Sequence, residues 1–179
     1  MRDVMIDLET MGTKPGCPII SIGAVEFDRY TGETGAEIEI VFDFKEAIDL
    51  GEPQGSTVEW WMRQSAQSRE ALLRGTTGVV EGFMEFIRWF NANAKACCVW
   101  GNGATFDISI LEHALLKYVD KVPWEFWAIR DCRTIEDLAT ISRKAFKRDG
   151  THHTALADAK YQVKYISAMI NQLRVGDSA

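Results

Sequence analysis

The sequence lacks long hydrophobic runs, and this absence excludes a helical membrane-spanning protein. None of its apolar stretches approaches the roughly 20 residues that cross a bilayer, and the N-terminus has no cationic segment followed by an apolar stretch. We therefore expect a cytoplasmic protein that makes no use of a membrane.

Cysteine is scarce and its spacing carries no disulfide or redox motif. The four cysteines form no C-x-x-C pair, and they are Cys17, Cys97, Cys98 and Cys132. We expect reduced thiols in the core. A zinc site that combines them with His152 or His153 would fit no common zinc spacing.

Positive charge is also in short supply, because 20 Lys and Arg residues face 26 Asp and Glu residues, for a net charge of −6. Proteins that coat nucleic acid by charge alone are usually basic. This balance does not exclude a protein that acts on nucleic acid, provided that bound cations offset clustered carboxylates. Four basic residues cluster at 143–148: Arg143, Lys144, Lys147 and Arg148. They would form either a solvated helix face or a contact to phosphate groups.

The 179 residues fit one domain with a substantial core, since 46% of them are apolar. The sequence has no internal repeat, low-complexity segment or interdomain linker. We expect a single domain over residues 1–175 and a frayed tail at 176–179.

Two carboxylates follow a short apolar run near the N-terminus. Residues 4–6 lead directly into Asp7 and Glu9, and residues i and i+2 of a strand point to the same face, roughly 7 Å apart. Like charges this close resist ionisation unless a cation is held between them. Hard oxygen ligands favour magnesium or manganese. A surface strand end without a ligand is the alternative reading of such a triplet.

The periodicity predicts an α/β fold with a mixed five-stranded sheet and helices on both faces, because three strands precede an alternation of helix and strand. Ser56 and Glu59 suggest a capping box for the first helix. Strands are expected at 3–9, 19–27, 36–42, 96–100 and 127–129. Helices are expected at 56–62, 78–91, from 107 onward, 134–146 and 154–173.

Three acidic motifs in order resemble the DEDD 3′-to-5′ exonucleases, a superfamily of ribonuclease H-like fold. The motifs are Asp7-x-Glu9, Asp107 after Phe106, and a histidine followed five residues later by Asp158. The histidine places the resemblance in the histidine-type (DEDDh) branch. Within it, residues 20–25, 58–61 and 100–107 resemble the phage and bacterial exonuclease-A-like group, which includes 3′-5′ exoribonuclease-like proteins.

The resemblance implies release of nucleoside monophosphates from the 3′ ends of single-stranded DNA or RNA, with two Mg²⁺ or Mn²⁺ ions as cofactors. Asp7 would bridge ions about 4 Å apart. Glu9 and Asp158 would hold one ion, and Asp107 would support the other through water.

The same resemblance makes His153 the general base that takes a proton from the attacking water. Its ordinary pKa of about 6.5 suits this role at physiological pH. His152 is the competitor, but only His153 lies five residues before Asp158.

Expected substrate contacts come from the same motifs. Leu8 would pack beneath the terminal base, and Thr10 would help to clamp the terminal sugar. Trp60 and Trp61 lie about 100° apart on a helix, so that one of them is free to stack on a base or to pack on a loop. Many family members carry asparagine where Gly103 stands here, which puts the usual asparagine contact in doubt. The expected contacts are Leu8, Thr10, Asn102, Phe106 and Trp61.

Two other functions stay open at this point. One is a catalytically silent nucleic-acid-binding or polymerase-associated module, and the other is an endonuclease of the wider fold. The intact acidic quartet speaks against the first, and the histidine-to-aspartate spacing speaks against the second. The choice between DNA and RNA is not readable from the sequence. The resemblance also implies pairing as a homodimer.

Overall fold

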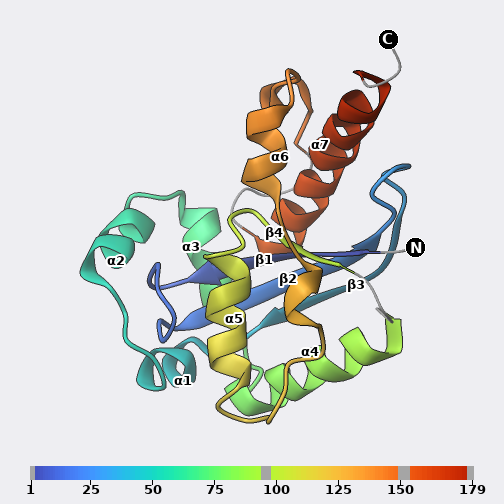
Figure 1. Cartoon of the computed structure of the whole chain (residues 1–179). Coiled ribbons are helices and arrows are strands. Elements are labelled where there is room, and N and C mark those ends of the chain that lie inside the picture. The colour runs from blue at the N-terminus through green and yellow to red at the C-terminus, as the bar shows by residue number, and fades with distance from the viewer. Residues whose placement is uncertain (1–2, 94–97, 149–153, 177–179) are drawn as a thin grey trace.

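A mixed five-stranded sheet forms the centre of the protein, in the order β3-β2-β1-β4-β5 (Figure 1). The computed structural model describes residues 3–93, 98–148 and 154–176. The first three strands are antiparallel neighbours, whereas β4 runs parallel to β1 and β5 runs parallel to β4. The strands are β1 (Asp3–Thr10), β2 (Ile19–Phe27), β3 (Thr34–Val41), β4 (Val99–Gly101) and β5 (Ile129–Asp131).

Helices cover both faces of this sheet, which confirms the predicted architecture. On one face α7 packs across β1 and β2, and α6 packs against α7. On the other face α4 and α5 close the larger of the two cores (Figure 1). Two short helices, α2 and α3, extend the molecule beyond the carboxyl end of β1 (Figure 1). The helices are α1 (Phe44–Asp49), α2 (Gly55–Met62), α3 (Ala66–Leu73), α4 (Val79–Asn93), α5 (Asp107–Leu115), α6 (Cys132–Leu138) and α7 (Ala155–Gly176).

The alternation along β1 decides which residues reach the site. Val4, Ile6 and Leu8 belong to the core on the α4 and α5 face, whereas Met5 belongs to the core under α7. Successive strand residues point to opposite faces, so the odd-numbered carboxylates share the α7 side. The prediction that Asp7 and Glu9 converge is confirmed.

Several element boundaries differ from the sequence prediction. Helix α2 begins at Gly55 with Gln54 as its N-cap and no side-chain capping bond, so the predicted capping box at Ser56 is wrong. Strand β5 begins at Ile129, because residues 126–128 form the 3₁₀ helix η1 (Phe126–Ala128). Helices α1 and α3 were not predicted.

The predicted helix at 134–146 is also wrong at both ends. Helix α6 begins at Cys132, where the Asp131 side chain caps it by accepting from Thr134 N. It ends at Leu138, because Gln172 of α7 accepts hydrogen bonds from the main-chain N–H groups of the next turn, at Thr140 and Ile141. A short 3₁₀ helix, η2 (Arg143–Ala145), follows.

Three remaining predictions concern thiols, membranes and the tail. Cys17 and Cys132 are buried free thiols and Cys98 is half-buried, while Cys97 lies outside the described residues. No helix in the described parts of the chain is long and apolar enough to span a membrane. Of the predicted frayed tail, Gly176 is the last residue of α7, and residues 177–179 lie outside the described residues.

Candidate active site

A cavity of about 560 Å³ opens where the carboxyl end of β1 meets the first turn of α7 and the start of α5. Three of the four predicted acidic residues line it, and helix α2 forms the opposite wall. Ligand pockets for small molecules have volumes of roughly 300 to 1,000 Å³. Its lining residues are Asp7, Leu8, Glu9, Thr10, Gly12, Thr13, Ser56, Thr57, Trp60, Trp61, Asn102, Phe106, Arg133 and Asp158.

Three carboxylates meet at the floor of this cavity. One oxygen from each of Asp7, Glu9 and Asp158 lies within 4.8 Å of the other two. Glu9 and Asp158 are only 8% and 9% exposed. Strand alternation brings the first two together, and the first turn of α7 adds the third.

The fourth acidic residue reaches the same site from another element. Asp107 is the first residue of α5, and its Oδ1 accepts a hydrogen bond from Leu8 N at 3.2 Å. A Cβ atom at Gly101 would lie 3.0 Å from Asp107 Cβ, so glycine at the end of β4 leaves room for this carboxylate. The first and second motifs are therefore in direct contact.

The cluster resists ionisation in the absence of a cation. Loss of water around Asp7 raises its pKa well above the usual value, and the charges of Asp107, Glu9 and Asp158 raise it further. Burial, with the Asp158 and Asp107 charges, raises the pKa of Glu9 to about 8. Burial raises the pKa of Asp107 to about 7, although the Leu8 amide and Arg133 act in the opposite direction.

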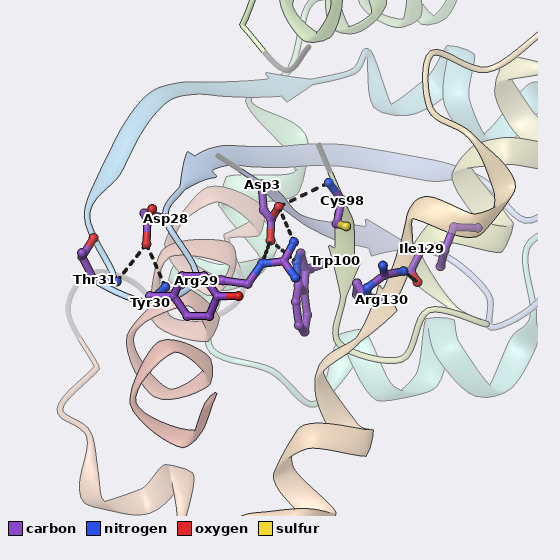
Figure 2. Close-up of polar contacts among 9 residues, drawn as sticks. All are labelled: Asp3, Asp28, Arg29, Tyr30, Thr31, Cys98, Trp100, Ile129 and Arg130. Atoms are coloured by element: carbon purple, nitrogen blue, oxygen red, sulfur yellow. Dashed lines mark hydrogen bonds and ion pairs between the residues drawn. The ribbon is translucent and has the colours of Figure 1, made fainter. Parts of the chain in front are cut away.

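A buried carboxylate elsewhere in the chain shows how the fold compensates such a charge. Asp3 lies at the opposite end of β1 and is fully buried (Figure 2). It accepts hydrogen bonds from Arg29 Nη2 at 2.7 Å, Trp100 Nε1 at 2.8 Å and Cys98 N at 3.3 Å, and Arg29 Nε lies 2.6 Å away (Figure 2). Every part of this carboxylate is paired within the protein.

The active-site carboxylates lack comparable compensation. Glu9 Oε1 and Asp107 Oδ2 are buried without a hydrogen-bond partner among the described residues. Buried polar atoms normally have partners, so an acceptor without one indicates a place for an ion or water, or a catalytic role. Carboxylate oxygens are the ligands that Mg²⁺ and Mn²⁺ prefer. The donor set therefore fits divalent cations, and among the described residues it contains no cysteine that would suggest structural zinc.

The sequence prediction missed two polar residues at the site and gave a third, Arg148, a different role. Gln162 donates from Nε2 to Asp7 Oδ1 at 2.6 Å, and its spacing of four residues from Asp158 on a helix was the available signal. Arg133 lines the cavity beside Asp107. Arg148, expected on a solvated helix face or at a phosphate, instead forms an ion pair with Asp158. Its Cζ lies 4.9 Å from the centroid of the Tyr161 ring.

The predicted substrate contacts all line the cavity, but in different ways. The Thr10 hydroxyl donates to Gly12 O at 2.7 Å. Trp61 is 4% exposed and donates from Nε1 to Thr10 O at 2.9 Å, so it holds the last residue of β1 in place. The Trp60 and Trp61 ring centroids lie 4.9 Å apart in an edge-to-face arrangement, and Trp60 is the more exposed of the two, at 44%. Leu8, Asn102 and Phe106 also line the cavity.

The third motif is described only in part. Asp158 joins the cluster, whereas His152 and His153 lie outside the described residues. The basic segment does not form the predicted helix end, because it runs through η2 into the chain that precedes residue 149. Within it Arg143 pairs with Glu136 at 3.3 Å, and Lys144 and Lys147 are exposed.

Comparison with solved structures gives the same fold. The zinc-bound complex of E. coli exonuclease I with single-stranded DNA superposes with a TM-score of 0.71 at 15% identity, over 99% of this chain and 42% of that chain. The nuclease domain of 3′hExo, a DEDDh family member bound to rAMP, has a TM-score of 0.60 at 13% identity, over 94% of this chain and 91% of that chain. The chain thus spans less than half the length of exonuclease I.

Comparison of sequences extends the likeness to a family. The chain is 25% identical to an exodeoxyribonuclease of Enterobacteria phage T4 over an alignment of 206 residues, which covers 92% of this chain and 90% of the phage protein. Residues 2–170 match the family described as the 3′-5′ exoribonuclease Rv2179c-like domain. Because this match covers nearly the whole chain, the protein belongs to that family and is a 3′-5′ exonuclease.

Proposed function

We propose that the protein removes nucleoside monophosphates from the 3′ end of single-stranded DNA or RNA, with two divalent metal ions, Mg²⁺ or Mn²⁺. The observation that carries this proposal is the group of three carboxylate oxygens within 4.8 Å of one another, at the floor of a cavity of about 560 Å³. Such a group has a low affinity for protons at neutral pH only when cations compensate it.

In this proposal each acidic residue has a role set by its position. Asp7 would contact both ions, Glu9 and Asp158 would hold one of them, and Asp107 would support the second. When bound, the ions would lower the pKa of a water molecule and neutralise charge on the leaving 3′-oxygen.

The remaining steps belong to residues around the cluster. His153 would accept the proton of the attacking water, a role that rests on its spacing from Asp158. Thr10 would help to hold the terminal sugar and Leu8 would pack beneath the terminal base, because both line the cavity next to Glu9. The exposed face of Trp60 would stack on a base, a contact worth about 1 to 3 kcal/mol.

In this proposal the substrate is single-stranded nucleic acid, and the experiment below tests DNA and RNA in parallel. The phage relative is described as an exodeoxyribonuclease, the matched family as exoribonuclease-like, and the solved structures hold single-stranded DNA or rAMP. We also propose that the protein acts in the cytoplasm and forms a homodimer. Light scattering coupled to gel filtration would measure the oligomeric state.

The experiment is digestion of a 5′-labelled single strand, as DNA and as RNA, with Mg²⁺. A ladder that shortens one nucleotide at a time from the 3′ end is expected, and excess chelator should stop it. Asp7→Ala should show no ladder. Internal cuts would identify an endonuclease, an intact strand would identify a binding module, and full turnover in chelator would overturn the metal-dependent mechanism.

A further inference from the structure

Gln162 makes a side-chain hydrogen bond to the carboxylate at the centre of the acidic cluster. Its Nε2 donates to Asp7 Oδ1 at 2.6 Å. The side chain projects from α7 one turn after Asp158, so one face of this helix supplies both a member of the cluster and the residue that holds its neighbour.

The surroundings of Gln162 argue against a purely space-filling role. The residue is 3% exposed, and its Oε1 is buried without a hydrogen-bond partner among the described residues. An apolar side chain of the same length would fill this space without leaving a buried acceptor unpaired. Among the described residues, the hydrogen-bond partner of the Gln162 side chain is Asp7.

The direction of this hydrogen bond suits a carboxylate that binds a metal ion. The amide N–H donates to one oxygen of Asp7, and the other lone pairs of the carboxylate stay available for a metal ion. No Lys or Arg is recorded in an ion pair with Asp7 among the described residues; Arg148 pairs with Asp158 instead. Gln162 thus orients Asp7 without bringing a competing positive charge next to it.

We propose that Gln162 is a positioning residue that fixes the Asp7 carboxylate in the orientation that binds divalent metal. This inference rests on the proposed metal-dependent function and adds a residue to it. Outer partners of metal ligands hold those ligands in place, and losing one typically weakens metal affinity by about 10- to 100-fold.

The test substitutes Gln162→Met, which keeps the length and helical preference of the side chain but removes the donor. Calorimetry with Mn²⁺ alone, without substrate, should show affinity at least about 10-fold weaker than in the wild type. In assays, the Mg²⁺ concentration for half-maximal rate should rise by a similar factor, whereas the KM for the oligonucleotide at saturating Mg²⁺ should stay within about two-fold. A packing role would leave the metal dependence unchanged.

Ser167→Ala is the matched control, because Ser167 is another buried polar residue of α7, 4% exposed, whose Oγ has no partner among the described residues. It should leave metal affinity unchanged. If Gln162→Met does not fold, Gln162→Asn keeps the amide but is one methylene too short to hold the bond, and it should show the same weakening.

The outcomes separate the two proposals. A wild-type protein that needs no metal overturns the proposed function itself. If the wild type binds Mn²⁺ and a folded Gln162→Met or Gln162→Asn variant binds it with the same affinity, the role of Gln162 alone is overturned. The role is also overturned if the Gln162 variants and Ser167→Ala lose Mn²⁺ affinity to the same extent.

Discussion

Gly23 lies against the main chain of Ala155, so closely that a Cβ atom at position 23 would be 2.1 Å from the Ala155 carbonyl carbon. In the β1–β2 register Gly23 is also the direct partner of Asp7. The first turn of α7, which carries Asp158, therefore packs on the sheet beside the first acidic motif.

Gly23→Ala should disturb the fold and the site together. The new methyl group meets main-chain atoms that cannot rotate away, so α7 must shift, and overpacking of this kind costs about 1 to 3 kcal/mol. Urea unfolding and Mn²⁺ calorimetry would measure both losses. Gly55→Ala is the control, since nothing lies within 4 Å of its Cβ position, and it should change stability by less than about 0.5 kcal/mol. Equal stability of the two variants would contradict the close approach.

Asp7→Asn should stabilise the metal-free protein while it removes activity. The substitution deletes one of several mutually repelling, poorly hydrated charges, so in chelator at pH 8 the free energy of unfolding should rise. At pH 5 the gain should shrink, because acid already neutralises the carboxyl group. Turnover with Mg²⁺ should fall by orders of magnitude. A variant less stable than the wild type in chelator would mean that the Asp7 charge is compensated in the fold.

The stability of the metal-free protein should fall as the pH rises. The folded-state pKa values of Glu9, about 8, and Asp107, about 7, exceed the usual 4.5 and 3.8. Between each usual value and the raised value, the folded protein binds more protons than the unfolded chain. Their contribution is complete below the usual values and is lost as the pH passes through about 7 to 8.

Thermal unfolding in chelator across this pH range would measure the slope. Mg²⁺ should raise the unfolding temperature most at high pH, and its binding at pH 7 should release protons. Glu9→Gln should flatten the profile. An unfolding temperature that rises between about pH 6 and pH 8 in chelator would have the wrong sign.

Much of the site followed from strand alternation, because it depends only on neighbours in sequence. Asp7 and Glu9 share a face for that reason, and the bounds of β2 (Ile19–Phe27) were predicted without error. The start of α5 at Asp107 was likewise visible, since an acidic residue suits the first helical turn.

The rest depended on contacts between distant segments. Helix α3 buries only Ser68 and Leu72, so its sequence carries little amphipathic signal. The end of α6 at Leu138 reflects Gln172, which lies 32 residues after Thr140 and competes for the main-chain N–H groups of the next turn. The pairing of Arg148 with Asp158 depends in the same way on how the chain returns to the site.

His153→Ala should lower turnover by about 10²- to 10⁴-fold, the usual worth of a general base, while Mn²⁺ binding persists. The prediction rests on the spacing to Asp158 alone, because both histidines lie outside the described residues. His152→Ala is the matched control and should be far milder. The wild-type rate under single-turnover conditions should rise through roughly pH 6 to 7. The reverse ranking of the two variants would show that the third motif is misaligned.

Neutralising Lys144 and Lys147 should weaken the binding of long single strands and reduce its salt dependence. Both side chains are exposed in the segment that leads toward the third motif, whereas Arg148 of the same segment is engaged with Asp158 and is left unchanged. Each lost phosphate contact removes about 0.7 from the log-log salt slope for single strands, so the double variant should lose at most about 1.4.

Hydrolysis of a dinucleotide should barely change in this variant, because so short a substrate does not extend beyond the acidic cluster. Lys45→Ala combined with Lys117→Ala is the control: it changes the net charge equally, its residues are exposed, and neither lines the active-site cavity. Fluorescence anisotropy over a range of salt concentrations gives the slopes. An equal loss on dinucleotide and long strand would mean that the substitutions disturb the site. An equal slope change in the control would mean that net charge, and not a path along residues 143–148, attracts the strand.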